Sequence, residues 1–235
     1  MCNNASYIVI QLLRVKRKIS FSILILIYAA TTAQVPVRYE PRHKVALENE
    51  WIRLLDVRLP PGDTSLFHIH EIPSFFIPLS TTAIGIEVKG QLPQESKFTL
   101  GATWYNGFEN GPLIHKVWNS DTNVLHVIDL ELLSTKNSTL STIVQLPNSK
   151  IDFENEKVRV YKFEVVPNQS FTLPSLKIPM IFISLSGAEL QMQNAINKDS
   201  YHLKAGDFQW LEAGQSFTIN NKQVTSANAI LILLK

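Results

Sequence analysis

Cysteine is almost absent from this sequence of 235 residues, and the single one, Cys2, lies near the N-terminus. Cys2 falls within residues 1–33, a segment that we expect to be removed, so the remaining chain would contain neither a disulfide nor a thiol nucleophile. A metal ion in that chain would have to be bound by His, Asp or Glu. A chain of about 200 residues can bury a substantial core without a disulfide.

A long apolar run is missing as well, because the one apolar segment is too short for a membrane span. Residues 19–30 ("ISFSILILIYAA") are uncharged and follow a cluster of four Lys and Arg residues. A transmembrane helix needs about 20 apolar residues, whereas a basic cluster, a short apolar run and small residues up to Ala33 are typical of a secretory signal peptide. We therefore expect cleavage before Gln34 and a periplasmic or extracellular protein, with an uncleaved membrane anchor as the alternative.

Excess basic charge is also lacking outside this segment. The whole chain has 22 Lys and Arg against 20 Asp and Glu, and the four charged residues of segment 1–33 are all basic, which leaves 18 basic residues against 20 acidic ones. A slightly acidic chain has no electrostatic footprint for nucleic acid. We expect neither nucleic acid nor, after cleavage, a membrane as a partner.

Segments with a helical period of apolar residues do not occur after residue 33. Short runs of alternating or continuous apolar residues, such as 51–59 ("WIRLLDVRL") and 124–133 ("VLHVIDLELL"), end instead at Pro, Gly and Asn turns. This pattern predicts an all-β chain of short strands. Pro78, within an apparent strand, predicts an edge position or a bulge there.

The sequence repeats itself. Residues 48–80 align without a gap onto residues 154–186, and residues 108–119 match residues 211–222 more loosely. The chain is therefore predicted to contain two copies of one domain. We expect a signal peptide, an N-terminal domain, a linker and a C-terminal domain at residues 1–33, 34–135, 136–150 and 151–235.

Two histidines, His68 and His70, lie one residue apart in an apolar strand of the first copy. Alternate side chains of a strand project to the same face, and burying two imidazoles on one face calls for something that binds both. A third histidine, His115, lies further along the same copy. We predict that His68, His70 and His115 bind one metal ion.

These residues resemble the two motifs of the cupin superfamily. Gly62, five further residues and His68-x-His70 resemble the first motif, and His115-x3-Asn119 resembles the second. Together with the repeat, the chain resembles a bicupin, which implies two tandem jelly-roll barrels, or double-stranded β-helices. The second motif departs from the family pattern, because it has one extra residue between glycine and histidine and lacks the usual proline.

The first motif departs from the family pattern too. In cupins a glutamate usually follows the histidine pair by three or four residues, but those positions hold Ser74 and Phe75. Glu71 is a possible replacement, although alternation puts it on the face opposite the histidines unless a bulge near Pro73 turns it round. The expected set is three histidines and water, which resembles the three-histidine iron centres of thiol and diketone dioxygenases among the cupins.

The remaining candidates have simpler interpretations. We expect His43, His126 and His202 to be hydrogen-bonded core residues, and Arg53, which recurs as Arg159, to be a scaffold charge paired to a carboxylate. Five aromatic residues are expected to fill the barrel core: Phe75, Phe76, Trp104, Tyr105 and Trp118.

The second copy lacks the histidines. It has Pro174, Leu176 and Thr218 at the positions assigned to His68, His70 and His115. We therefore predict a degenerate C-terminal cupin domain without a metal site.

The expected function is that of an exported bicupin with one divalent metal ion (Fe, Mn, Zn or Ni) and no other cofactor. A redox metal would allow oxygen and a small-molecule substrate to bind together, as in a dioxygenase-like oxidoreductase, whereas Zn²⁺ or Mn²⁺ would suit hydrolysis or isomerisation. Neutral histidines leave the ion its full charge, which favours an anionic substrate. No catalytic residue is assigned, and Tyr105 and Glu71 are only candidates for a general base. The alternative is a non-catalytic module that binds or senses a small ligand, its degenerate barrel serving as scaffold or as the interface of a homodimer.

Overall fold

The structure, a computed structural model, describes residues 34–136 and 143–235. The predicted signal peptide, residues 1–33, and part of the predicted linker lie outside the described residues. Strands make up nearly all the regular structure, together with one turn of 3-10 helix, η1 (Val37–Tyr39), within the described ranges. None of the described segments forms a helix of the length and apolar character needed to cross a membrane.

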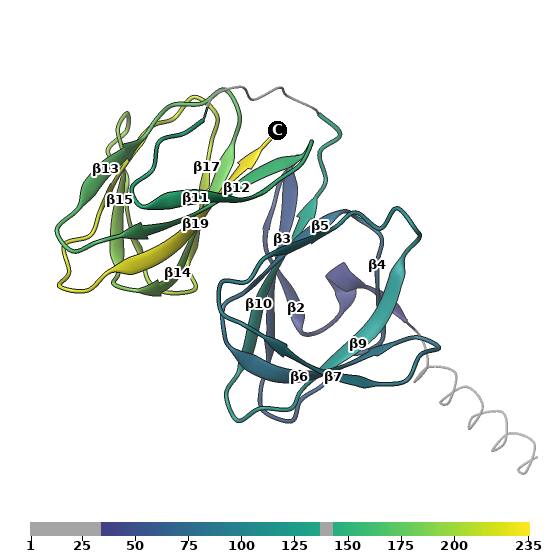
Figure 1. Cartoon of the computed structure of the whole chain (residues 1–235). Helices are drawn as coiled ribbons and strands as arrows, with labels where there is room; N and C mark the ends of the chain where they lie inside the picture. The colour runs from purple at the N-terminus through teal and green to yellow at the C-terminus, as the bar shows by residue number, and fades with distance from the viewer. Residues whose placement is uncertain (1–33, 137–142) are drawn as a thin grey trace, which may run out of the picture.

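The first half forms two five-stranded sheets, visible on the right of Figure 1. The first sheet contains, in spatial order, β1 (Val35–Pro36), β4 (His68–His70), β9 (Leu113–Asn119), β6 (Thr82–Val88) and β7 (Gln94–Phe98). The second sheet contains β2 (His43–Glu48), β3 (Ile52–Leu59), β10 (Leu125–Leu132), β5 (Ser74–Pro78) and β8 (Trp104–Asn106). The predicted jelly-roll barrel is confirmed.

The second half repeats this arrangement in the residues that the structure describes, and the positions that correspond to β1, residues 141–142, lie outside them. One sheet contains β11 (Ser149–Glu154), β12 (Val158–Val165), β19 (Ala227–Leu234), β14 (Met180–Gly187) and β17 (Phe208–Leu211). The other contains β13 (Ser170–Leu173), β18 (Phe217–Asn220), β15 (Leu190–Asn194) and β16 (Ser200–Leu203). The chain is therefore all-β with two tandem barrels, as the sequence predicts. The exact domain boundaries at 135/136 and 150/151 stay a prediction.

The repeat extends to local irregularities. The pairing of β2 with β3 shifts register between Val45 and Leu47, and the pairing of β11 with β12 shifts between Ile151 and Phe153. A bulge at the same place in both copies turns both strands in the same way. The repeated motif Glu-Asn-Glu-x-x-Arg also has one structural cause, because the Asn49 side chain accepts the backbone N–H groups that follow it and Asn155 does the same.

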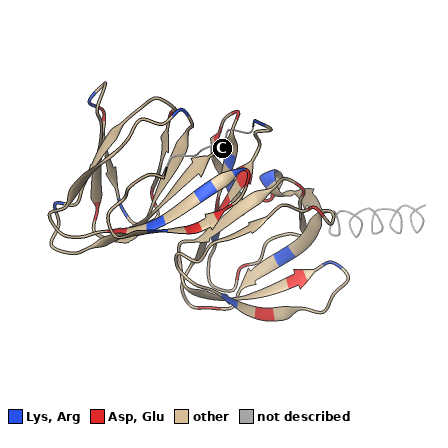
Figure 2. Ribbon diagram, turned by 45° about the horizontal axis from the view of Figure 1, so that its top comes forward, with Lys and Arg blue, Asp and Glu red and all other residues tan. Residues whose placement is uncertain are grey.

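The two barrels pack against each other through the sheet that contains β3 and the sheet that contains β12. On β3, Leu55 and Val57 belong to the core of the first barrel, whereas Ile52 and Leu54 belong to an apolar cluster shared with the second barrel. The second barrel contributes Val158 and Val160, among others, to that cluster. Strands buried on both faces explain the continuous apolar runs in the sequence. Acidic and basic residues are interspersed along both barrels in Figure 2.

Pro78 has the predicted edge setting locally, because no strand pairs with it on the side away from β10, although β5 itself lies inside the sheet. It is the last residue of β5, which lies between β10 and β8 in the sheet, and β8 pairs only with Ser74 to Phe76. Since Pro78 lies beyond the part of β5 paired with β8, its missing N–H removes no bond to that neighbour.

Candidate metal centre

The three histidines predicted as ligands come together inside the first barrel. His68 and His70 lie on one face of β4 and are buried, with exposed fractions of 1% and 2%. β4 pairs antiparallel with β9, and the register places His115 opposite His68. The ring centroids lie 4.9 Å apart for His68 and His70, 4.6 Å for His68 and His115, and 5.0 Å for His70 and His115.

A fourth histidine, His43, joins this cluster from the start of β2. Its ring centroid lies 4.5 Å from that of His68, and the possible ligand nitrogens of His43, His68 and His70 all lie within 4.8 Å of one another. The interpretation of His43 as only a hydrogen-bonded core residue was incomplete. A signal was available in the repeat, because His43 corresponds to Ser149 in the second copy, and the other clustered histidines are replaced there too.

Oxygen atoms face the Nδ1 side of three of these rings. His68 Nδ1 donates to the Leu66 carbonyl at 2.8 Å, His43 Nδ1 donates to Glu40 Oε2 at 2.7 Å, and His70 Nδ1 lies 3.5 Å from Asp129 Oδ2. A protonated Nδ1 leaves the lone pair on Nε2, which is how ligating histidines are oriented in metal sites. The chain thus fixes the tautomers of His43 and His68 with Nε2 available.

The Nε2 atoms of His68, His70 and His115 are placed where their lone pairs could bind a cation. His70 Nε2 and His115 Nε2 lie 3.1 Å apart, and among the described residues no hydrogen-bond partner reaches the buried His68 Nε2. Buried polar atoms are normally paired. A divalent ion would accept these lone pairs, so the residues present fit the metal centre that the sequence predicts.

Burial keeps the imidazoles in the form that binds metals. It lowers the pKa of His68 to about 2, with the neighbouring imidazoles adding to the effect, and it lowers the pKa of His70 as well. Burial and His43 lower the pKa of His115 to about 4. At neutral pH these rings are uncharged and their lone pairs are free to coordinate.

Asp129 is a second functional candidate that sequence reasoning missed. It lies on β10, is 1% exposed, and belongs to the cavity wall beside His70. Burial, with the nearby charge of Glu131 adding to it, raises the pKa of Asp129 well above its usual range. The strand alternation of Val127, Asp129 and Glu131 toward the barrel interior was the available signal.

The positions near the usual cupin glutamate supply no carboxylate to the cluster. Ser74 is buried and its hydroxyl donates to the Ile72 carbonyl, while Phe75 packs in the cluster between the barrels. Glu71 is exposed, as strand alternation predicts. Tyr105 stacks on Phe153 of the second barrel, with ring centroids 5.7 Å apart. Neither Glu71 nor Tyr105 lines the cavity in front of the histidines, so the structure gives no support to either candidate for a general base.

The aromatic residues that were predicted to fill the barrel core lie in different surroundings. Phe76 and Trp104 line the cavity in front of the histidines instead of closing a solid core. Trp118 lies over Gly85, where an added Cβ would come within 1.8 Å of its ring. Only Phe75 and Tyr105 pack in an apolar cluster, and that cluster lies between the two barrels.

The residues interpreted as scaffold keep that role. His126 Nε2 lies 2.7 Å from Asp56 Oδ1, and His202 Nδ1 lies 2.8 Å from Glu189 Oε1, so both histidines have carboxylate partners outside the cluster. The prediction that His202 is a core residue was wrong, because its side chain is exposed, and His126 is only half-buried. Arg53 donates to Glu48 and Glu131. In the second copy, Arg159 donates to Glu154 in the same way.

A cavity of about 260 Å³ opens onto the four histidines. Its lining is mostly aliphatic and aromatic. The lining residues are His43, Val57, Leu59, Ser65, His68, His70, Phe76, Ile86, Phe98, Trp104, Asn106, Leu113, His115, Val117, Leu125, Val127 and Asp129.

The matching region of the second barrel has no imidazole. In the sequence alignment Pro174 and Leu176 stand at the positions of His68 and His70. The counterpart of His115 in the structure is Phe217, not Thr218 as predicted, because His115 pairs with Val88 and Phe217 pairs with Asn194, the residue that corresponds to Val88. Asn119 and Asn221 show this, because the first donates to the carbonyls of Leu59 and Asn123, and the second to those of Val165 and Thr225. Counting back from these two residues pairs His115 with Phe217.

Comparisons of sequence find no protein-family model and no curated protein that match this chain. Comparison of structure finds solved proteins with the same fold. AerE from Microcystis aeruginosa matches with a TM-score of 0.56 and 13% identity, over 83% of this chain and 98% of that chain. A cupin 2 conserved barrel domain protein from Leptotrichia buccalis matches with a TM-score of 0.52 and 11% identity, over 80% of this chain and 86% of that chain.

A third match is a salicylate 1,2-dioxygenase from Pseudaminobacter salicylatoxidans, with a TM-score of 0.58 and 10% identity, over 84% of this chain and 78% of that chain. Another structure of the salicylate 1,2-dioxygenase contains gentisate adducts. Identities this low show a shared fold and carry no substrate across.

Proposed function

The chain is a bicupin by fold, and from this premise we propose that it is a metal-dependent enzyme with one centre, in the N-terminal barrel. The observation that carries the proposal is a cluster of four imidazoles, of which the buried His43, His68 and His70 have possible ligand nitrogens within 4.8 Å of one another. Nδ1 of His43 and Nδ1 of His68 are bonded to oxygen, and His115 Nε2 lies 3.1 Å from His70 Nε2. The metal ligands in this proposal are His68, His70 and His115, with His43 as the fourth.

Four nitrogen ligands favour Fe, Mn, Zn or Ni over Mg or Ca, which prefer oxygen. An ion that takes about six ligands would keep two positions for exogenous molecules. A redox-active ion with two such positions supplies the chemistry of a dioxygenase, in which oxygen and substrate bind side by side. The fold shared with a salicylate 1,2-dioxygenase supports this choice over hydrolysis or isomerisation.

The surroundings of the centre supply positioning and exclusion of water. The Leu66 carbonyl and Glu40 hold the rings of His68 and His43 in place, and Glu40 is itself held by the backbone N–H groups of Arg42 and Leu66. The apolar wall of the cavity keeps bulk water from the reacting groups. We further propose that the protein is exported and acts on its substrate outside the cytoplasm, because the basic and apolar pattern of residues 1–33 has the form of a secretory signal.

Elemental analysis of the protein purified without an affinity tag tests the proposal. We expect about one equivalent of a transition metal per chain, and oxygen consumption with a suitable small molecule. A protein that reproducibly contains no metal and takes up none on dialysis against Fe, Mn, Zn or Ni would contradict it.

The second candidate is a non-catalytic module that binds or senses a small ligand. It is favoured by the cavity lining, in which Asp129 is the one acidic side chain and the described residues offer no other carboxyl group for proton transfer. Such a module would be stabilised by its ligand in proportion to ligand concentration. It would consume no oxygen with that ligand, which separates the two candidates.

A further inference from the structure

The residues that line the cavity limit which ligands can bind there, independently of the metal. Most of the surface in front of the histidines comes from aliphatic side chains on β3, β6, β9 and β10, including Val57, Ile86, Leu113, Val117 and Val127. Phe76, Phe98 and Trp104 add an aromatic wall. Among the described residues that line the cavity, none is Lys or Arg.

The few polar groups in these walls are mostly engaged already. Ser65 Oγ accepts the Val117 N–H at 2.9 Å and faces the Val117 carbonyl at 3.3 Å. Asn106 Oδ1 accepts the Phe108 N–H at 3.0 Å, which leaves the Asn106 amide NH₂ for a ligand. Asp129 is an acid and cannot neutralise an anion. A carboxylate placed away from the metal would therefore be buried without a cationic partner, which is strongly unfavourable.

The size and shape of the cavity limit the ligand further. A dry cavity of about 150 Å³ can hold benzene, so about 260 Å³ suits one ring with a few substituents. The Phe76 and Trp104 rings are stacked, with centroids 5.1 Å apart and an interplanar angle of 14°, and the Phe98 ring lies 5.2 Å from that of Trp104. An aromatic wall of this kind suits a flat ligand.

We propose that the ligand of this cavity is a small, uncharged, mainly apolar molecule, about one ring in size, that reaches the metal through an oxygen donor. This inference rests on the proposed function for the metal contact only. It differs from the expectation of an anionic substrate, because the metal can satisfy one donor group but the walls offer no cation for a second anionic group. It also separates this cavity from the gentisate-binding dioxygenase that shares the fold, since gentisate is an aromatic acid.

The decisive experiment compares two probes with the same metal-binding head on the metal-loaded protein. Methyl 3,4-dihydroxybenzoate and 3,4-dihydroxybenzoate differ only in the methyl group that removes the carboxylate charge, and the neutral ester is the larger molecule. Titration calorimetry is expected to show at least about tenfold tighter binding of the ester, because burial of the unpaired carboxylate opposes binding of the acid. Equal or tighter binding of the acid would overturn the inference.

A pair of variants shows whether the walls cause the difference. Asn106→Lys places a cation in the lining at a half-buried position, and is expected to shift the ratio of the two affinities toward the acid. Leu92→Lys adds the same charge at an exposed position outside the cavity lining and should leave the ratio of the two affinities unchanged. An identical response of both variants would attribute the ratio to general charge and contradict the role of the walls.

Failure of the metal proposal is distinguished by repeating the comparison without metal. Toluene and benzoate share a ring but carry no chelating group, so their binding to the chelator-treated protein depends on the walls alone. We expect toluene to raise the melting temperature and benzoate at the same free concentration to leave it unchanged. Stabilisation by benzoate and not by toluene would overturn the inference whether or not the protein binds a metal.

Discussion

The two barrels have the same strand order and the same bulge, yet one encloses a cavity with imidazoles and the other is filled with hydrocarbon. Five cavity residues have non-ligating counterparts. Strand pairing relates His43 to Ser149, Asp129 to Leu231 and His115 to Phe217. The gapless sequence alignment relates His68 to Pro174 and His70 to Leu176. The fold therefore does not require these polar groups, which is why their presence in one copy points to function.

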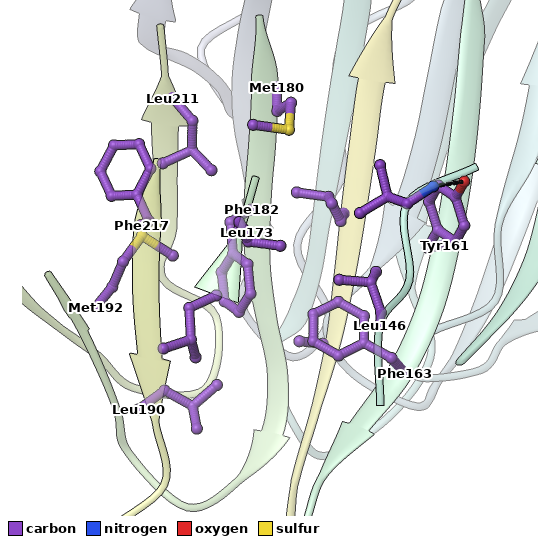
Figure 3. Close-up of a cluster of buried hydrophobic side chains, with 14 of the residues drawn as sticks. Leu146, Tyr161, Phe163, Leu173, Met180, Phe182, Leu190, Met192, Leu211 and Phe217 are labelled. Carbon is purple, nitrogen blue, oxygen red and sulfur yellow. Dashed lines mark hydrogen bonds between the residues drawn. The ribbon is translucent and has the colours of Figure 1, made fainter. Parts of the chain in front are cut away.

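The second barrel also has larger side chains at positions where the first barrel has its cavity. Leu55 and Val57 on β3 correspond to Tyr161 and Phe163 on β12, and both larger residues belong to the buried cluster of Figure 3. The Tyr161 hydroxyl accepts the Val144 N–H at 3.2 Å, so even its polar atom is paired. A barrel packed in this way gains buried apolar area where the other barrel keeps room for a ligand.

The largest expected effect is the loss of metal binding by the first barrel when one imidazole is removed. His68→Ala, His70→Ala and His115→Ala are each expected to abolish stoichiometric metal binding, because each removes a ligand from the chelate. Elemental analysis after dialysis against the metal measures this. His126→Ala and His202→Ala serve as matched controls, and full occupancy in any triad variant would remove that residue from the set of ligands.

A charge placed between the barrels should strongly destabilise the whole chain. Leu130 on β10 is 0% exposed and lies in the cluster shared by both barrels. Leu130→Asp would bury an unpaired carboxyl group, at a cost of about 4 kcal/mol in the free energy of unfolding. Urea unfolding at neutral pH measures this cost. Exposed Leu92, changed to Asp, is the control and should alter stability by less than about 0.5 kcal/mol.

Loss of the carboxylate behind His43 should weaken the centre by a smaller amount. Glu40→Gln keeps the shape of the side chain but replaces the charged acceptor of His43 Nδ1, and changes of this kind typically cost about 10- to 100-fold in metal affinity. Competition with a coloured chelator measures the change. If Glu40→Gln binds metal as tightly as the unchanged protein, His43 contributes nothing to coordination.

Lowering the pH should destabilise the metal-free protein, because the first barrel buries imidazoles in their uncharged form and the second barrel has none at these places. The pKa values of His68 and His115 are lowered in the folded state to about 2 and about 4, whereas unfolded imidazoles titrate near about 6.5. The unfolded state therefore binds more protons below about pH 6.5, and stability falls as the pH drops from there toward about 4.

Each such imidazole contributes on the order of 1 kcal/mol per pH unit to this loss. Urea unfolding of the chelated protein at pH 7, 6 and 5 measures the slope. A variant that carries His68→Pro, His70→Leu and His115→Phe should show a shallower slope. An identical slope would mean that these imidazoles are not buried in the uncharged form.

The smallest expected effect is that of the same triple substitution on folding. Because the second barrel folds with Pro174, Leu176 and Phe217 at these places, the variant should remain soluble and keep its far-UV circular dichroism without metal. Chelation of the unchanged protein should likewise leave the spectrum intact and lower the melting temperature only by ligand linkage. Unfolding in either case would make the centre structural.

Sequence reasoning predicted the strands and the repeat because both depend on local apolar patterns, and it placed His68 and His70 on one face by alternation alone. It missed His43, since no fixed spacing connects the start of β2 to β4 and only tertiary packing brings them together. It assigned Thr218 instead of Phe217, because loop lengths differ between the copies and a one-residue slip exchanges the faces of a strand. Trp104 lines the cavity, whereas its neighbour Tyr105 packs on the other face of β8, against the cluster between the barrels.

The apolar interface between the barrels has a consequence for the origin and assembly of the chain. Either half made alone would expose the apolar face that it now buries, for example Ile52 and Leu54 on one side or Ile230 and Ile232 on the other, and would have to aggregate or pair with another copy. Duplication and fusion place both halves of that pairing in one polypeptide. A homodimer of the fused chain would therefore have to use a different surface, and the second barrel, which lacks the histidines, covers the apolar face of the first.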